Sequence, residues 1–178
     1  MSRSARLVVG LLGFSGFLAI SAAPARADDA AKVTAKSAFK KIKSLAGEWS
    51  AESKGEHLAG PTKVTYKVTA AGSAVLQTQF PGSGHEMVTV YHLDGDDLKA
   101  THYCAAGNQP RMKLDKKAST PDTLVFVFDG GTNFDPDTDM HIHALKTEFK
   151  DGNHVKEEWD AFADGKKATT TVIEMSKP

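Results

Sequence analysis

The stretch His85–Met112, HEMVTVYHLDGDDLKATHYCAAGNQPRM, decides the fold because two strand-like segments flank an Asp-Gly turn. An Asp-Gly pair between alternating apolar and polar residues is typical of a tight β-hairpin. If the strands pair around Gly95-Asp96, one face mixes apolar side chains with groups that bind ligands or metals. That face holds Met87, Thr89, Tyr91, Leu93, Leu98, Ala100, His102 and Cys104. It predicts the interior of a β-barrel, with Glu86, His92 and Lys99 outside.

The rest of the chain predicts one helix followed by many short strands. Apolar residues recur at helical spacing between Asp28 and Leu45, with lysines around them, and Gly47 marks a stop. Short alternating segments then follow one another between turn residues, at 48–53, 62–69, 74–80, 112–114, 123–128, 140–150, 154–162 and 169–175. This spacing predicts an all-β fold, a barrel or a sandwich.

Gly47-Glu48-Trp49, just after the helix and at the start of the first strand, resembles the lipocalin or calycin signature. Leu45–Trp49, Tyr91–Gly95 and Thr101–Met112 also resemble a family of secreted bacterial lipocalin-like proteins of unknown function. The resemblance implies a single antiparallel up-and-down calycin-type barrel behind a short helix, with Trp49 plugging one end. It implies a fold and not an activity.

The first 27 residues have the pattern of a cleaved secretory signal peptide. Arg3 and Arg6 form a basic start, Leu7–Ile20 is an apolar run too short for a comfortable membrane span, and Ala25-Arg26-Ala27 is a cleavage motif. The pattern predicts one mature domain, residues 28–178, in the periplasm or outside the cell. No stable membrane insertion is expected after cleavage.

The charge pattern argues against a nucleic-acid partner. The full chain carries 22 basic and 22 acidic residues, and removal of Arg3, Arg6 and Arg26 leaves 19 against 22, a net charge of −3. These charges are interspersed, with no basic block. Cys104 is the single cysteine, so an internal disulfide is excluded; either the core supplies the stability, or Cys104 is buried, capped or bound.

Charge pairs set the expected register of a second hairpin, at 140–162. Pairing Lys150 with His154 places Glu148 opposite Lys156 and Lys146 opposite Glu158, which suits a solvated face. The inward face then holds His141, His143, Leu145, Thr147, Phe149, Val155, Glu157, Trp159 and Ala161. A slip of one residue would exchange the two faces.

The leading hypothesis is a small-molecule binding protein with a ligand inside the barrel. Apolar walls with a few polar groups are what ligand pockets use. The predicted pocket residues are Trp49, Tyr66, Tyr91, His102, Cys104, Arg111, His141, His143, Glu157 and Trp159, with Phe149 in the wall. Asn108, Gln109 and Arg111 are expected in a loop over the mouth.

A metal-dependent or acid–base enzyme in the same cavity is the main alternative. His141 and His143 on one strand face lie about 7 Å apart along the backbone and can converge on a divalent metal such as zinc. His102 is the favoured third ligand, with Cys104 or Glu157 as substitutes. Glu157 could instead move protons beside a histidine. A third reading is a structural or interaction module of the cell envelope with a filled barrel.

Overall fold

The computed structural model describes residues 32–56 and 58–177. The predicted signal peptide, residues 1–27, lies outside them. One helix, α1 (Ala35–Lys43), precedes ten strands: β1 (Gly47–Lys54), β2 (Gly60–Thr69), β3 (Ala74–Gln79), β4 (Met87–Asp94), β5 (Asp97–Tyr103), β6 (Gln109–Leu114), β7 (Thr123–Thr132), β8 (His141–Phe149), β9 (His154–Ala163) and β10 (Lys166–Ser176). A 3-10 turn, Ala70–Gly72, joins β2 to β3.

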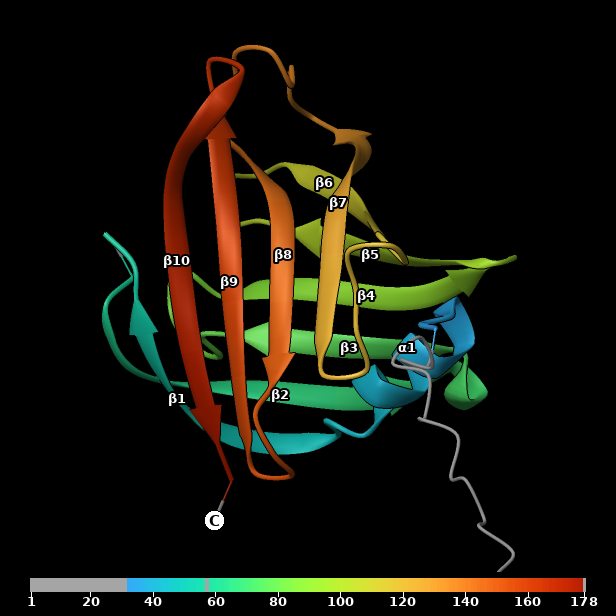
Figure 1. The fold of residues 1–178 in the computed structure, drawn as a ribbon. Helices are drawn as coiled ribbons and strands as arrows, with labels where there is room; N and C mark the ends of the chain where they lie inside the picture. Colours follow the sequence, from blue (N-terminus) through green and yellow to red (C-terminus); the bar gives the residue numbers. More distant parts are fainter. Residues whose placement is uncertain (1–31, 57, 178) are drawn as a thin grey trace, which may run out of the picture.

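The strands form a closed antiparallel barrel in which each strand pairs with its neighbours in the sequence and β10 closes on β1. Figure 1 shows β7–β10 crossing in front of β2–β5 at a steep angle. The predicted all-β, up-and-down barrel with a short helix near the N-terminus is confirmed. Closure leaves no free sheet edge among these ten strands.

Helix α1 is shorter than predicted and begins at its cap. The Thr34 side chain accepts a hydrogen bond from the Ser37 backbone N–H at 3.1 Å, and Ser37 Oγ accepts one from the Thr34 N–H at 3.0 Å. This reciprocal cap satisfies backbone donors that the first helical turn leaves free. Phe39 and Ile42 face the barrel and are buried.

An up-and-down barrel places its loops alternately at two ends. The helix end carries α1 and the β2–β3, β4–β5, β6–β7 and β8–β9 connections, and α1 contacts β2, β4 and β5 there. The loop end carries the β1–β2, β3–β4, β5–β6, β7–β8 and β9–β10 connections. The two ends are therefore chemically different, and only one of them is covered by a helix (Figure 1).

The predicted register of β4–β5 is confirmed, and that of β8–β9 is confirmed from Ala144 to Phe149. In β4–β5, Tyr91 pairs with Ala100 and Thr89 with His102, and the predicted inward residues Met87 to Tyr91 alternate as buried. In β8–β9, Glu148 pairs with Lys156 and Lys146 with Glu158. These opposite-charge pairs lie on the outer face as predicted, and a slip of one residue would have exchanged the two faces of the strand.

A β-bulge corrects the prediction for the start of β8. The register shifts between Ile142 and Ala144, so His143 has no partner on β9. Such an extra residue exchanges the two faces of a strand at that point. Ile142 therefore pairs with inward-facing Ala161, and His141 pairs with Phe162. His141 is buried and His143 is half-buried, but the bulge breaks the alternation that placed both on one face, whereas Leu145, Thr147 and Phe149 are buried as predicted.

Within 32–56 and 58–177, no helix is long and apolar enough to cross a membrane.

Candidate functional site

A cavity of about 540 Å³ occupies the loop end of the barrel. Apolar side chains make up most of its wall, and they come from both halves of the barrel. The lining residues are Glu56, Leu58, Gln79, Phe80, His85, Met87, His102, Cys104, Ala105, Ala106, Met140, Ile142, Trp159, Ala161, Ala168, Thr169, Thr171 and Ile173. Met140 is 45% exposed and stands at the rim. The volume lies within the range of small-molecule pockets.

His102 is a buried polar residue of the cavity wall, and one of its ring nitrogens has no hydrogen-bond partner. Its side chain is 1% exposed, and its Nδ1 lies 2.9 Å from Thr89 Oγ1. Its Nε2 has no hydrogen-bond partner. Three other buried side-chain atoms in the described part of the chain lack partners, on Ser53, Asn108 and Thr147, and none of these residues lines the cavity. An unpaired buried polar atom costs free energy, so its presence beside a cavity points to a ligand.

The imidazole of His102 is held neutral. Burial lowers its pKa from 6.5 to about 4, because the apolar surroundings disfavour the charged ring. The Trp159 ring packs beside it with 5.1 Å between ring centroids. A neutral ring in this position can form one hydrogen bond with a ligand.

Three of the predicted pocket residues, His102, Cys104 and Trp159, line the cavity. Cys104 is half-buried, with its Sγ 3.9 Å from Met87 Sδ, and burial raises the pKa of its thiol. A raised thiol pKa reduces the fraction of reactive thiolate at neutral pH. Cys104 therefore serves as an apolar wall residue here.

Glu157 lies beneath the cavity floor, inside a network of hydrogen-bond donors. Tyr66 donates its hydroxyl to Oε1 at 2.6 Å. Oε2 accepts from Trp159 Nε1 at 2.9 Å, from Gln77 Nε2 at 2.8 Å and, more weakly, from Gln79 Nε2 at 3.5 Å. Glu157 is fully buried. The predicted inward carboxylate is therefore present, but it does not line the cavity.

The arrangement of donors is that of an ionised carboxylate. Gln77 Nε2 also donates to the Tyr66 hydroxyl at 2.8 Å, so the Tyr66 proton is directed at Glu157. Burial raises the pKa of Glu157, and its hydrogen bonds oppose that rise. Burial and the Glu157 charge together raise the pKa of Tyr66 and of Tyr91, so both phenols stay protonated donors.

Sequence reasoning missed Gln77 and Gln79. They alternate with Leu76 and Thr78 on β3 and point inward at the positions where a barrel strand normally places apolar residues. Tyr91 donates to Gln77 Oε1 at 2.9 Å, which extends the network to β4. The available signal was two glutamines two residues apart on a predicted strand, since a half-buried strand puts such residues on one face.

His141 and His143 belong to an aromatic cluster away from the cavity. His143 is stacked between Phe128 and Phe162, with centroid distances of 4.7 Å and 3.9 Å. Phe134, from the β7–β8 loop, stacks on His141 at 4.7 Å. His141 Nδ1 lies 2.9 Å from the Asp139 carbonyl oxygen, and its Nε2 lies 3.0 Å from His143 Nδ1. This pair ties the β7–β8 loop to β8.

The structure does not assemble the predicted metal site. His102 lies in the cavity wall, whereas His141 and His143 hydrogen-bond to each other in the aromatic cluster. In the described part of the chain, no three His, Cys, Asp or Glu side chains gather closely enough to hold a metal ion. The bulge in β8 contributes to this, because it breaks the alternation that predicted His141 and His143 side by side on the inward face.

Arg111 and Gln109 also depart from their predicted positions. Both lie in β6 rather than in a loop, and Arg111 is exposed between buried Pro110 and Met112. Its guanidinium is therefore outside the barrel and cannot reach a ligand in the cavity. Asn108 is in the expected connection and donates to the Met140 carbonyl at 2.7 Å, which holds one rim loop to another.

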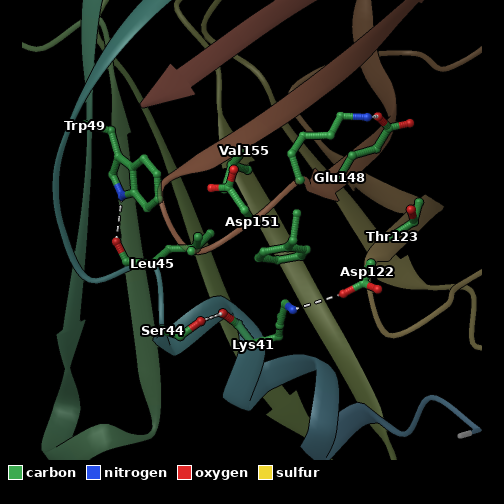
Figure 2. Close-up of a pocket in the computed structure, with 12 residues that line it drawn as sticks. Lys41, Ser44, Leu45, Trp49, Asp122, Thr123, Glu148, Asp151 and Val155 are labelled. Carbon is green, nitrogen blue, oxygen red and sulfur yellow. Dashed lines mark hydrogen bonds and ion pairs between the residues drawn. The ribbon is translucent and has the colours of Figure 1, made fainter. Parts of the chain in front are cut away.

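Trp49 and Phe149 border a groove at the helix end instead. Figure 2 shows this groove, of about 660 Å³, between α1 and the β8–β9 connection. Trp49 Nε1 donates to the Leu45 carbonyl at 2.8 Å, and Lys41 Nζ pairs with Asp122 at 3.4 Å. Lys150 pairs with Glu148 in the same groove. Because these charges are already paired, a ligand would have to displace existing contacts.

Comparison with known proteins supports the fold alone. No family model matches the chain, and no curated protein matches it. One solved structure, a protein of unknown function from the DUF3598 family of Nostoc punctiforme, has a TM-score of 0.50 and 13% sequence identity. The match covers 77% of this chain and 49% of that chain, so this chain spans about half the length of that protein. The chain is thus similar in fold to a barrel protein of unknown function.

Proposed function

We propose that this chain is an exported small-molecule binding protein that holds a ligand in the loop-end cavity of a lipocalin-like barrel. One observation carries the proposal: His102 lines an apolar cavity and has a buried ring nitrogen without a partner. A ligand with one polar group would satisfy that nitrogen and remove apolar surface from water.

The contrast between the two ends of the barrel supports this location. At the helix end, Lys41 and Lys150 are paired with Asp122 and Glu148. At the loop end, apolar side chains surround a cavity of about 540 Å³. Filling the cavity would add contacts without breaking ion pairs, so the loop end is the better binding site.

Export is supported by the sequence of residues 1–27, and the lipocalin type by Gly47 and Trp49 at the start of β1, next to α1. We expect cleavage after Ala27 and recovery of the mature chain from the periplasm or the medium. N-terminal sequencing of the purified protein checks this, and a retained Met1 would contradict export by cleavage.

Binding is tested with Nile red, an uncharged dye that fluoresces in apolar surroundings. Ala161 lines the cavity and is 6% exposed, so Ala161→Phe fills it from the wall. Ala163 lies two residues further along β9 and does not line it, so Ala163→Phe is the matched control. We expect the dye to bind the wild type and Ala163→Phe, and Ala161→Phe to weaken binding at least tenfold. Equal binding by both variants would place the dye elsewhere and refute the proposal.

A further inference from the structure

We infer that the cavity prefers a largely apolar molecule with one hydroxyl or carbonyl group that pairs with His102, and that it rejects carboxylates. This inference rests on the proposed binding function and specifies the chemical class of its ligand.

The basic side chains in the described cavity wall are two histidines, His85 and His102, and the acidic side chain of Glu56 lies in the wall as well. Among its described lining residues there is no lysine or arginine. Arg111, the basic residue expected at the mouth, is exposed on the outside of β6. His102 is neutral at physiological pH because burial lowers its pKa to about 4. A carboxylate moved into this cavity would lose its hydration, gain no lysine or arginine partner in exchange, and meet the like charge of Glu56 in the wall.

The hydrogen-bond donors nearest the cavity floor already donate to Glu157. Trp159 has one N–H, and it donates that hydrogen to Glu157 Oε2 at 2.9 Å. The Gln79 amide is directed at the same oxygen at 3.5 Å. Both residues line the cavity, so a bound anion would lie close behind another buried negative charge. Like charges in a low-dielectric site repel one another, which disfavours anionic ligands further.

His102 suits a neutral partner in either tautomer. The Thr89 hydroxyl can donate to Nδ1 or accept from it, so Nε2 either carries a proton or offers a lone pair. A hydroxyl group on the ligand can pair with both forms, and a carbonyl pairs with the protonated form. Neither partner brings a charge into the apolar cavity, so neither carries the cost of burying an ion.

A matched pair of ten-carbon probes tests the selection near neutral pH: 1-decanol and decanoate, each used to displace Nile red. The chains are alike, so differences in affinity report the head group. We expect 1-decanol to bind at least tenfold more tightly than decanoate. His102→Phe should weaken 1-decanol about tenfold, the usual effect of losing one buried hydrogen bond. Ile142→Leu, another wall residue, is the control and should leave the order of affinities unchanged.

The outcomes separate this inference from the binding function. Decanoate binding as tightly as 1-decanol would overturn the selection and leave the cavity a binding site. An unchanged 1-decanol affinity in His102→Phe would overturn the role of His102. Failure of Nile red itself to bind would remove the proposed function and this inference with it.

Discussion

Replacing Tyr66 with phenylalanine removes the hydroxyl that donates to Glu157 Oε1 at 2.6 Å. Hydrogen bonds to charged groups contribute roughly 1.5–3 kcal/mol, and Gln77 Nε2 loses an acceptor in the same change. We therefore expect Tyr66→Phe to lower the free energy of unfolding by about 3 kcal/mol. The substitution keeps the ring, so no large cavity adds to this loss.

Tyr91→Phe is the matched control. Tyr91 is also buried, but its hydroxyl donates to the neutral Gln77 Oε1 at 2.9 Å. Loss of that neutral hydrogen bond should cost about 1 kcal/mol. The two variants thus differ mainly in whether the lost partner is the carboxylate of Glu157.

Urea denaturation near neutral pH, followed by tryptophan fluorescence, measures both losses. The comparison is valid if the dependence of the free energy on urea is the same in all three proteins. Losses of the same size in Tyr66→Phe and Tyr91→Phe would show that Glu157 is not an ionised acceptor and would refute the network described above.

Three further predictions concern the buried ionisable groups and the aromatic cluster. Burial raises the folded-state pKa of Glu157 above 4.5, so the wild type should lose stability as the pH rises from 4.5 through that pKa. Glu157→Gln should lack this loss. If the stability of the variant changed with pH as that of the wild type does, the raised pKa of Glu157 would be contradicted. The folded-state pKa of His102 is depressed to about 4, so its contribution, about 3 kcal/mol, should be present above pH 6.5 and disappear as the pH falls towards 4. His102→Gln should flatten that part of the urea-unfolding profile, and an unchanged slope would count against a depressed pKa. His143→Leu removes the donor to buried His141 and one stacked ring, so it should cost about 2 kcal/mol and speed proteolysis of the β7–β8 loop; His92→Leu, outside the cluster, should have a smaller effect.

The strand pairing could be predicted from sequence because it depends on local chemistry. The Asp-Gly turn set the register of β4–β5, and the charges of Lys146, Glu148, Lys156 and Glu158 set that of β8–β9. Alternation then assigned His102 and Glu157 correctly to the inward face. Neither assignment required knowledge of distant contacts.

The site was harder to predict because it depends on features that alternation does not contain. The bulge after Ile142 breaks the alternation that placed His141 and His143 together in the cavity, and both pack among Phe128, Phe134 and Phe162 instead. The depth of each inward residue along the barrel also matters. It separates His102, which lines the cavity, from Glu157, which lies beneath the floor.

The most direct test of the account is the nitrogen chemical shift of the His102 ring, recorded by NMR during a titration with 1-decanol. The account predicts a change at Nε2, the nitrogen without a protein partner, while the ring shifts of His143 in the aromatic cluster stay constant. An unchanged His102 ring in a protein saturated with 1-decanol, with changes instead at Trp49 by the helix-end groove, would contradict it.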